Sequence, residues 1–596
     1  MTPSKEDKSA LNKLGVSSVL ELALITPSSY DDRNISKTPK INQTNVVKVE
    51  VLSTSKTHKL FRANVLAWEK SVDVVFFNPT KYHFSAFVKG AMFFIQGKLE
   101  YNFAKLQFAQ PKILSEVGGI FPVYKTSLQQ KTILRLMKNY LSIEELVREG
   151  LEVEKATTLY NFHNPSLHVN YEDAYKRTIP VLKYIEIYLF IKKLNSKKQY
   201  FKATSVLNGD EKSFIKSLPF KLTNDQLKAI ADMKNDLSKD VSARRVVMGD
   251  VGSGKTLVIF ASVMMAYPKR AILMAPTTIL AAQIFEEAKK FLPLHVRVCL
   301  VESQDKKINL EEFDFIIGTH VLLYRELPKC DLVMIDEQHR FGVAQRDLIH
   351  KLVGEGKNHP HFLQFSATPI PRTMSLINSS LVSYSFIKEM PFKKDISTFV
   401  IGKSEFGKML AHVENEMKMG NQTIVVYPLV EESENFDYQS IDEGRAFWEK
   451  RYKNVYVTHG KDKNKEEVIK EFRDKGAILL ATTVVEVGIS LPKLSTIVIV
   501  GAEHLGLATL HQLRGRVSRT GLKGYCYLYT NKKTNERLEE FSKTISGFDI
   551  AELDLKYRQS GDILGGLIQH GEQFRFFDIK EDKKFLIEAR KILGLM

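Results

Sequence analysis

The chain is poor in the residues that build disulfide frameworks and compact metal sites. Among its 596 residues are three cysteines, Cys299, Cys330 and Cys526, which lie far apart and form no C-x-x-C pair. This spacing excludes a zinc ribbon built from neighbouring cysteines and gives no sign of a disulfide framework. We therefore expect a reducing, cytoplasmic location.

Long apolar runs and a targeting segment are also missing. The N-terminal stretch is polar and lacks the apolar core of a signal peptide. The most apolar long stretch, residues 179–191, is interrupted by Lys183 and Glu186, which is typical of a packed helix and not of a membrane span. No low-complexity tract or solenoid-length repeat is present. We expect a soluble protein without a membrane partner.

Basic charge is the main excess in the composition. The formal net charge is +17 at pH 7, while the share of charged residues, 26%, is ordinary for a globular protein. Such an excess indicates a polyanionic partner, with nucleic acid the first candidate and an acidic membrane surface the second. A generally basic proteome would give the same value. The length predicts about three or four domains.

A complete phosphate-binding loop is the clearest motif. Residues 249–256 read Gly-Asp-Val-Gly-Ser-Gly-Lys-Thr, with a strand-like run before them and an apolar helix-like run after them. The glycines let the backbone curl until its N–H groups point at phosphates. Lys255 would reach the β and γ phosphates, and Thr256 would hold Mg²⁺. The residues expected to bind the nucleotide here are Gly249, Gly252, Gly254, Lys255 and Thr256.

Two acidic residues follow a second apolar strand, residues 332–335. Asp336 is expected to hold Mg²⁺ beside Thr256, and Glu337 to orient or deprotonate the attacking water. Two acids in a surface turn would look the same in isolation, but the loop with Lys255 lies upstream. The pair therefore predicts hydrolysis of a nucleoside triphosphate.

Two further segments complete a nucleotide site. Gln226 could contact adenine with both groups of its amide, although a lone glutamine is normally a solvated helix residue. Residues 512–519 place Arg516 and Arg519 three apart, which predicts one helical face. From there the two arginines could cross a cleft between domains and stabilise γ-phosphate charge in the transition state. A solvated basic face or a DNA-phosphate patch would have the same spacing.

In this order the motifs resemble those of superfamily 2 helicases and translocases. Four more segments fit that superfamily: residues 275–280, 318–320, 366–369 and 481–488. The resemblance implies that Thr277, Thr319 and Thr482 contact nucleic-acid phosphates, which carry no base information. It also implies that Ser366, Thr368 and Gln512 couple the nucleotide state to movement.

Longer stretches resemble the RecG family of ATP-dependent DNA helicases, which remodel stalled forks and other branched DNA. They include Asp-Glu-Gln-His-Arg-Phe-Gly-Val from Asp336, Ser-Ala-Thr-Pro-Ile-Pro-Arg-Thr from Ser366 and Leu-His-Gln-Leu-Arg-Gly-Arg from Leu510. The primosomal helicase carries a zinc-binding cysteine cluster that this chain lacks, and DEAD-box RNA helicases have Ala-Asp where Gln338 and His339 stand. The resemblance covers essentially the whole chain, most strongly over residues 215–570.

Pattern and resemblance together predict an α/β multidomain protein. Short runs of period two between residues 46 and 122 favour an OB-fold-like β-barrel, and strands alternate with helices beyond residue 204. The resemblance identifies the barrel as a wedge and the α/β regions as two RecA-like parallel-sheet motor domains. The expected divisions are an N-terminal helical segment (1–44), the wedge (45–125), a helical linker (126–203), RecA-like domain 1 (204–391), RecA-like domain 2 (392–545) and a C-terminal translocation hairpin and tail (546–596).

The wedge and the C-terminal segment carry the expected DNA contacts. Phe77 and Tyr82 are the candidates for stacking on exposed base pairs, with the alternative that Phe77 fills the barrel core. The C-terminal segment departs from the family pattern, since Arg-Gln-Ser-Gly from Arg558 replaces Arg-Gly-Pro-Gly and an expected arginine is absent from the following loop. The coupling of force to DNA is therefore less defined by the sequence than the ATP chemistry.

The resemblance implies a motor that uses ATP and Mg²⁺, binds forks and four-way junctions, and drives fork regression or branch migration in recombination and repair. We also expect a monomer, with single-strand-binding protein as a candidate partner. Two other functions stay open. One is an RNA helicase of the same superfamily, and the other is a junction-binding scaffold that no longer turns over ATP.

Overall fold

The computed structural model describes residues 3–57, 60–102, 105–166, 169–302, 308–342, 345, 348, 357–368, 370–392, 394–429, 438–460, 462–483, 491–518, 521–557 and 574–595. The chain divides into two compact units. The first contains residues 1–192 with 574–578 and 584–596, and the second contains residues 193–573 and 579–583. Arg519, most of the predicted motif at 481–488 and the departed sequence at 558–571 lie outside the described residues.

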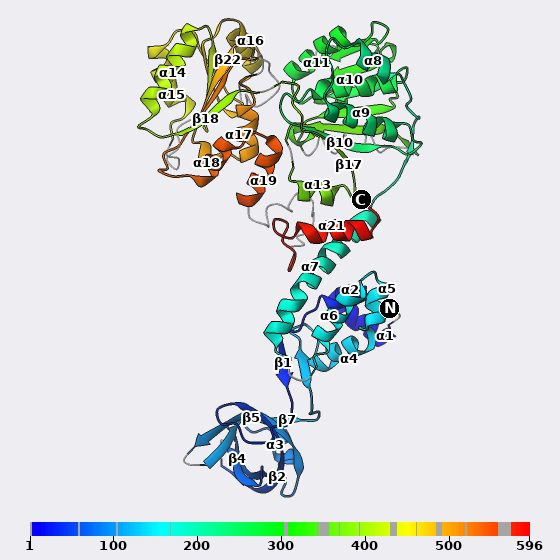
Figure 1. Cartoon of the computed structure of the whole chain (residues 1–596), viewed down its shortest axis with the longest axis vertical. Helices are drawn as coiled ribbons and strands as arrows, with labels where there is room; N and C mark the ends of the chain where they lie inside the picture. The colour runs from blue at the N-terminus through cyan, green and yellow to red at the C-terminus, as the bar shows by residue number, and fades with distance from the viewer. Residues whose placement is uncertain are drawn as a thin grey trace. The chain divides into compact units, whose positions relative to one another are not determined.

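The first unit contains a small β-barrel, drawn in blue in Figure 1. Its strand order is β2-β3-β4-β6-β5-β7, and an additional antiparallel β2–β5 pairing closes the sheet on itself. Alternate residues of each strand point inward, so Val47, Val49 and Val51 of β2 meet Phe108 of β6 in one core. The predicted OB-fold-like barrel is confirmed. Its elements are β2 (Thr44–Lys56), β3 (Phe61–Ala67), β4 (Lys70–Phe76), α3 (Lys81–Ala86), β5 (Met92–Asn102), β6 (Lys105–Ala109) and β7 (Lys112–Leu114).

Helices and one strand pair make up the rest of this unit. Strand β1 (Ser29–Asp32) pairs with β8 (Ile120–Val123) outside the barrel. The barrel sheet ends at Leu114 and β8 belongs to the β1 pair, which differs from a barrel that extends to residue 125. The helices are α1 (Lys5–Leu14), α2 (Val19–Ala23), α4 (Gln130–Tyr140), α5 (Ile143–Arg148), α6 (Val153–His163), α7 (Tyr171–Ser196) and α21 (Lys583–Ile592).

The second unit contains two parallel sheets, each forming one lobe. Lobe 1 has the order β12-β13-β11-β14-β16-β10-β17, and every pairing in it is parallel. Helices α8 to α11 cover this sheet in Figure 1. The elements are β9 (Lys202–Ala203), α8 (Glu211–Ser217), α9 (Asn224–Leu237), β10 (Arg244–Gly249), α10 (Lys255–Ala266), β11 (Ala271–Met274), α11 (Thr278–Phe291), β12 (Val298–Val301), η1 (Leu310–Glu312), β13 (Phe315–Gly318), η2 (His320–Tyr324), β14 (Leu332–Asp336), η3 (Gln338–Arg340), β15 (Asn358–His359), β16 (His361–Ser366), α13 (Arg372–Asn378) and β17 (Ser383–Ile387).

Lobe 2 repeats this plan without a phosphate-binding loop. Its order is β18-β23-β22-β19-β21-β20, again all parallel. The two RecA-like parallel-sheet domains are therefore confirmed. The elements are β18 (Ile396–Ile401), α14 (Phe406–Lys418), β19 (Gln422–Val426), α15 (Ile441–Arg451), β20 (Val455–Thr458), α16 (Lys465–Lys475), β21 (Ile478–Ala481), β22 (Leu494–Val500), η5 (Ala502–His504), α17 (Leu507–Arg514), β23 (Gly524–Tyr529), α18 (Glu536–Lys543) and α19 (Gly547–Tyr557).

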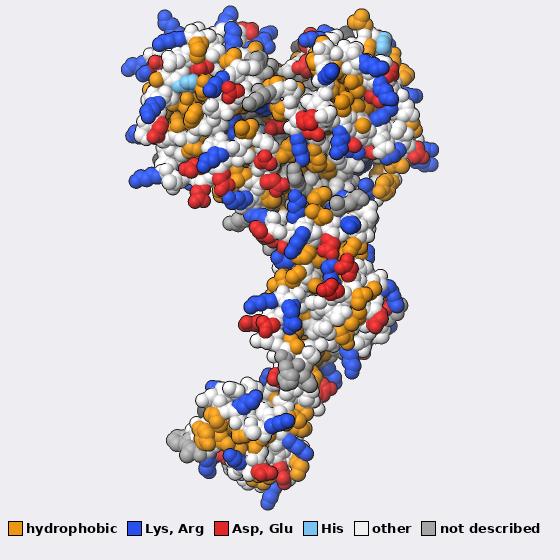
Figure 2. Space-filling model, in the orientation of Figure 1, with side chains coloured by type: hydrophobic (Ala, Val, Ile, Leu, Met, Phe, Trp, Pro, Cys, Tyr) orange, Lys and Arg blue, Asp and Glu red, His pale blue; other side chains and the backbone are white. Residues whose placement is uncertain are grey.

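Burial explains why these strands carry continuous apolar runs. Strand β14 has all five residues buried and β11 all four, because helices cover both faces of a parallel sheet. Helix α10 is apolar on every side and lies in the core of lobe 1. No helix among the described residues is long and apolar enough to cross a membrane. On the face shown in Figure 2, basic side chains are spread widely, with acidic ones between them.

Candidate nucleotide-binding site

The phosphate-binding loop (P-loop) joins β10 to α10 at the carboxyl end of the strand. Gly252 and Gly254 have φ angles of 81° and 77°, a region that glycine enters without the strain a side chain would bring. The loop therefore turns its backbone toward the N-terminus of α10, where an anion is favoured. The Lys255 Nζ donates to the carbonyls of Gly249, at 2.7 Å, and Asp250, at 3.1 Å. Its ammonium group is thus held over the loop.

Gln226 supports the loop from behind. It is almost fully buried, its Oε1 accepts from the Thr223 N–H at 2.8 Å, and its Nε2 donates to the Ser253 carbonyl at 2.8 Å. The first bond belongs to a capping box at the start of α9. Each amide group keeps one more hydrogen-bonding position, a second N–H on Nε2 and a second lone pair on Oε1, which an adenine contact would use. That contact stays a prediction, while the contact with the loop is what the geometry provides.

Asp336 ends β14 beneath the loop. Only 9% of it is exposed, and its Oδ1 is buried with no hydrogen-bond partner among the described residues. Burial, and then the charge of Glu337, raise the pKa of Asp336 to about 7, while Lys255 acts in the opposite direction. A buried carboxylate that lacks a donor is costly unless a cation or proton joins it. The arrangement is therefore suited to holding a cation.

Glu337 is held in an unusual conformation at the turn after β14. Its φ angle of 52° lies in the left-handed region, which is uncommon for a residue with a side chain. Its Oε1 accepts from the Ala367 N–H at 2.5 Å and its Oε2 accepts from the Ser366 hydroxyl at 3.1 Å. Ser366 in turn lies 2.8 Å from the Thr368 hydroxyl. The structure thus bonds Ser366, one of the three predicted coupling residues, to the predicted catalytic carboxylate and places Thr368, the second, next to Ser366.

Lobe 2 completes the site through α17 and the turn after it. Gln512 and Arg516 are both buried and line the same cavity as Lys255, and the Arg340 guanidinium donates to Gln512 Oε1. The prediction that the arginines share a helical face is wrong for Arg516, because α17 ends at Arg514 with Gly515 as its cap. A turn, not a helix, carries Arg516 to the cavity, and Arg519 lies outside the described residues.

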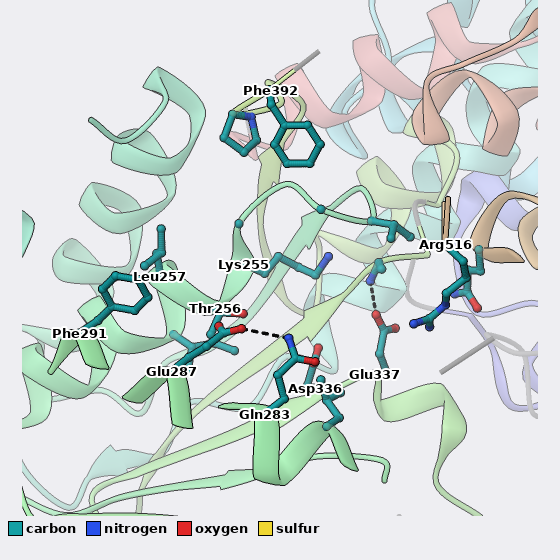
Figure 3. Close-up of a pocket in the computed structure, with 18 of the residues that line it drawn as sticks. Lys255, Thr256, Leu257, Gln283, Glu287, Phe291, Asp336, Glu337, Phe392 and Arg516 are labelled. Carbon is teal, nitrogen blue, oxygen red and sulfur yellow. Dashed lines mark hydrogen bonds between the residues drawn. The ribbon is translucent and has the colours of Figure 1, made fainter. Parts of the chain in front are cut away.

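The cavity enclosed by these groups has a volume of about 570 Å³, within the usual size of small-ligand pockets. Lys255, Asp336, Glu337 and Arg516 converge on it in Figure 3. Sequence reasoning missed part of its wall, including three aromatic residues from separate segments of the chain and a Gln–Glu hydrogen-bonded pair on α11. These residues are Phe220, Phe291, Phe392, Gln283 and Glu287.

The three threonines predicted to contact nucleic acid follow strands β11, β13 and β21. The hydroxyl of Thr277 accepts from the Leu280 N–H at 3.3 Å, and that of Thr319 accepts from the Val321 N–H at 3.5 Å. Both residues therefore cap the helices that they precede. Thr482 is half-buried just after β21. Thr277 and Thr319 lie at the carboxyl edge of the same sheet as the P-loop, where ligands of α/β proteins bind.

The two predicted wedge aromatics lie on the surface of the barrel. Phe77 is 51% exposed and Tyr82 is 61% exposed, whereas the preceding residue, Phe76, is 1% exposed and packs in the core. The alternative that Phe77 fills the barrel core is thus wrong, since alternation along β4 gives that place to Phe76. Tyr82 stands in the first turn of α3 with the exposed Lys81 beside it.

Comparison with known proteins identifies the family. A family model described as DEAD/DEAH box helicase matches residues 223–377, and one described as helicase conserved C-terminal domain matches residues 405–521. The ATP-dependent DNA helicase RecG of Helicobacter pylori strain J99 is 44% identical over 607 residues, which covers 98% of this chain and 97% of the relative. The chain belongs to the RecG family. The RecG helicase of Aquifex aeolicus is 35% identical, over 99% of this chain and 82% of its own length.

A solved RecG structure aligns with the whole chain. It is described as RecG bound to a three-way DNA junction, has a TM-score of 0.56 and 26% sequence identity, and covers 100% of this chain and 84% of its own. The resemblance noted in the sequence to RecG proteins is therefore confirmed. The roles of the individual RecG-family site residues remain predictions, to which the geometry above gives a physical basis.

Proposed function

We propose that this chain is an ATP-dependent DNA helicase and translocase that binds branched DNA and drives fork regression or branch migration. One observation carries the proposal. A RecG-family chain matched along nearly its full length also encloses a cavity walled by a P-loop, the acidic pair Asp336 and Glu337 of lobe 1 and an arginine of lobe 2. A wall contributed by both lobes allows the nucleotide state to control how the lobes meet.

The donor set fits a magnesium ion with a nucleoside triphosphate. The Asp336 carboxylate and the Thr256 hydroxyl line one cavity, and oxygen ligands of this kind are the ones Mg²⁺ prefers. Bound there, Mg²⁺ would neutralise charge on the β and γ phosphates. Thr256 and Asp336 would hold it, and the unpartnered buried oxygen of Asp336 supports this assignment.

The protein side chains supply the rest of the hydrolysis site. Lys255 binds the β and γ phosphates, and Glu337 holds the attacking water and accepts its proton. Arg516 reaches the cavity from lobe 2 and stabilises the γ-phosphate charge that grows in the transition state. Because Arg516 belongs to the other lobe, hydrolysis is fast only when the lobes meet correctly.

DNA engages two surfaces in this proposal. The barrel acts as the wedge, where Phe77 and Tyr82 stack on bases exposed at the branch point. Thr277, Thr319 and Thr482 contact phosphates along the motor lobes, which gives grip without base preference. Binding should therefore depend on the shape of the junction and weaken strongly with salt, since neutralising phosphates releases counterions. The monomeric state, single-strand-binding protein as a partner and a cytoplasmic location remain predictions.

The test is the steady-state ATPase rate with forked DNA, linear duplex, single strands and structured RNA, each at two salt concentrations. We expect the largest stimulation with forked DNA, and a loss of that stimulation at the higher salt concentration. Stimulation by structured RNA alone would favour an RNA helicase of the same superfamily. Binding of forks with no turnover would favour a junction-binding scaffold and contradict the proposal.

A further inference from the structure

One P-loop side chain points away from the nucleotide cavity and into lobe 2. Asp250 is buried, yet it does not line the cavity that its neighbours Val251 and Gly252 help to form. Its Oδ1 lies 2.5 Å from the Nε2 of His511 on α17 and accepts from the Val251 N–H at 2.6 Å. Its Oδ2 accepts from the Gly547 N–H, the first residue of α19, at 3.0 Å. One carboxylate therefore joins three elements.

The protonation state of His511 follows from its other neighbour. Nη2 of Arg514 lies 3.2 Å from the His511 Nδ1, and a guanidinium can only donate. The Nδ1 therefore accepts, which leaves the proton on Nε2, where it is donated to Asp250. Burial lowers the pKa of His511, which favours the same neutral form. Arg514 is fixed in turn by the Phe541 carbonyl and by its position over the Phe541 ring.

Two glycines allow this close approach. A Cβ on Gly547 would lie 2.8 Å from the His511 Nε2 and 3.0 Å from the Asp250 Cγ. A Cβ on Gly515, at the end of α17, would lie 3.0 Å from the Val251 Cβ. A separation of 2.8 Å is one that real Cβ atoms essentially never show, and 3.0 Å is tighter than most real contacts, so a side chain at either position would force the neighbouring groups to shift.

The second residue of α19, Phe548, contacts lobe 1. Phe548 packs on Val246 and Met248 of β10, the strand that leads into the P-loop. Its ring also meets the Phe386 ring edge-on, with the ring centroids 5.8 Å apart. Ile550, two residues later, belongs to the core of lobe 2. Helix α19 thus contacts both lobes, and its first residue is the one that Asp250 binds.

From these contacts we propose that Asp250 is a positioning residue that holds α17 and α19 of lobe 2 in register with the P-loop through neutral His511. The inference rests on the function proposed above and adds a part to its site. Arg516 follows α17 by two residues, so the register set at His511 decides whether its guanidinium reaches the cavity. Because Asp250 does not face the nucleotide, its loss should lower kcat for ATP and leave the KM for ATP little changed.

A matched pair of variants at His511 separates positioning from simple packing. The side-chain nitrogen of glutamine can take the place of Nε2 and donate to Asp250. Asparagine is shorter, so its side-chain nitrogen takes the place of Nδ1 and does not reach Asp250. We expect His511→Asn to lower the fork-stimulated kcat by roughly 5- to 150-fold, the usual range for coupling between sites. We expect His511→Gln to retain clearly more activity, with both variants melting at similar temperatures.

A second pair of variants tests the same contact without substituting Asp250 or His511. Gly547→Ala should reproduce the kcat loss of His511→Asn, because the new methyl group displaces both Asp250 and His511. Gly407→Ala on α14 of lobe 2 is the matched control, since a Cβ there meets no atom within 4 Å. Wild-type kcat in Gly547→Ala, or equal losses in the two His511 variants, would overturn the proposal.

Lobe docking gives a readout that does not depend on hydrolysis. The three native cysteines are buried, so dyes can be attached selectively at the exposed positions of Lys269→Cys in lobe 1 and Lys450→Cys in lobe 2. Energy transfer between the dyes should change in His511→Asn and Gly547→Ala and stay near the wild-type value in His511→Gln and Gly407→Ala. The same pattern is expected even if the wild type proves not to hydrolyse ATP. Unchanged energy transfer in all four variants would contradict the positioning role of Asp250 and leave the proposed function untouched.

Discussion

At the scale of single residues, Lys255 should separate ATP turnover from DNA binding. Its ammonium group lies over the P-loop and lines the cavity, far in sequence from the barrel. We expect Lys255→Ala to lower kcat by about 100- to 1000-fold, as the loss of one charge-stabilising donor does elsewhere, while fork affinity is kept. Lys289→Ala, an exposed lysine of α11, is the control. A parallel loss of fork binding, measured by fluorescence anisotropy, would contradict the separation.

Ser366 is the residue through which a coupling role can be tested. Its hydroxyl donates to the Glu337 Oε2, while the Ala367 N–H holds the other oxygen of that carboxylate. Ser366→Ala removes one of two supports, so we expect kcat for ATP to fall by about tenfold or less, in line with about 1 kcal/mol for a hydrogen bond. The DNA unwound per ATP hydrolysed should fall further. An unchanged ratio would assign Ser366 to hydrolysis alone.

At the scale of elements, the barrel presents a test of the wedge. Tyr82 extends from α3 beside Lys81, and stacking of a base on an aromatic ring contributes about 1–3 kcal/mol. We expect Tyr82→Ala to slow fork unwinding by about tenfold with the ATPase rate largely kept. Tyr101→Ala, an equally exposed tyrosine at the end of β5, is the matched control. Equal effects of the two substitutions would remove the special role of Tyr82.

A buried histidine makes the N-terminal helices sensitive to acid. The Nε2 of His163 on α6 lies 2.9 Å from the Ala23 carbonyl, and its Nδ1 lies 2.9 Å from the Tyr124 hydroxyl, so the neutral ring satisfies both neighbours. Burial lowers the pKa of His163 to about 4, so the unfolded chain binds a proton that the folded chain excludes between about pH 6.5 and 4. The stability that this residue provides is full above pH 6.5 and falls as the pH drops.

The size of this effect is about 3 kcal/mol over that interval, because each unit of pKa difference corresponds to about 1.4 kcal/mol. We expect the melting temperature of the wild type to fall more between pH 7 and 5 than that of His163→Gln, which cannot titrate. Other groups titrate equally in both proteins, so the difference isolates His163. Parallel melting curves across this range would show that folding does not shift the pKa of His163.

How far the sequence predicts each element depends on how local its cause is. Strands β10 and β14 were predicted because buried parallel strands carry continuous apolar runs, and the P-loop because its spacing is fixed by phosphate geometry. Strands β12 and β18, which lie at the edges of their sheets, were missed, and the polar Ser397 and Thr398 interrupt the apolar run of β18.

Contacts between distant residues were beyond such reasoning. Asp250 and His511 are separated by 261 positions, and the aromatic wall of the cavity gathers Phe220, Phe291 and Phe392 from three segments. Arg516 was predicted to reach the cleft from a helix. The structure brings it to the cavity from a turn instead, because α17 ends where Gly515 packs closely on Val251. Local pattern therefore predicts which residues carry chemistry, and tertiary packing decides how they are held.

At the scale of the whole molecule, one nucleotide cavity, two motor lobes and a barrel make up a machine for branched DNA. The cavity has walls from both lobes, so we expect ATP binding to favour their closure and hydrolysis to release it. A net charge of +17 supplies the attraction to DNA phosphates. Neither a nucleotide hydrolase without a wedge nor a wedge without a motor would convert one branched structure into another.

The most direct measurement follows a synthetic fork with labelled nascent strands and mismatches that block spontaneous branch migration. We predict that wild-type protein with ATP and Mg²⁺ releases an annealed nascent duplex together with the reannealed parental duplex, and that Lys255→Ala binds the fork without releasing either. Release without ATP, or rapid ATP hydrolysis on the fork with no annealed nascent duplex, would contradict the account.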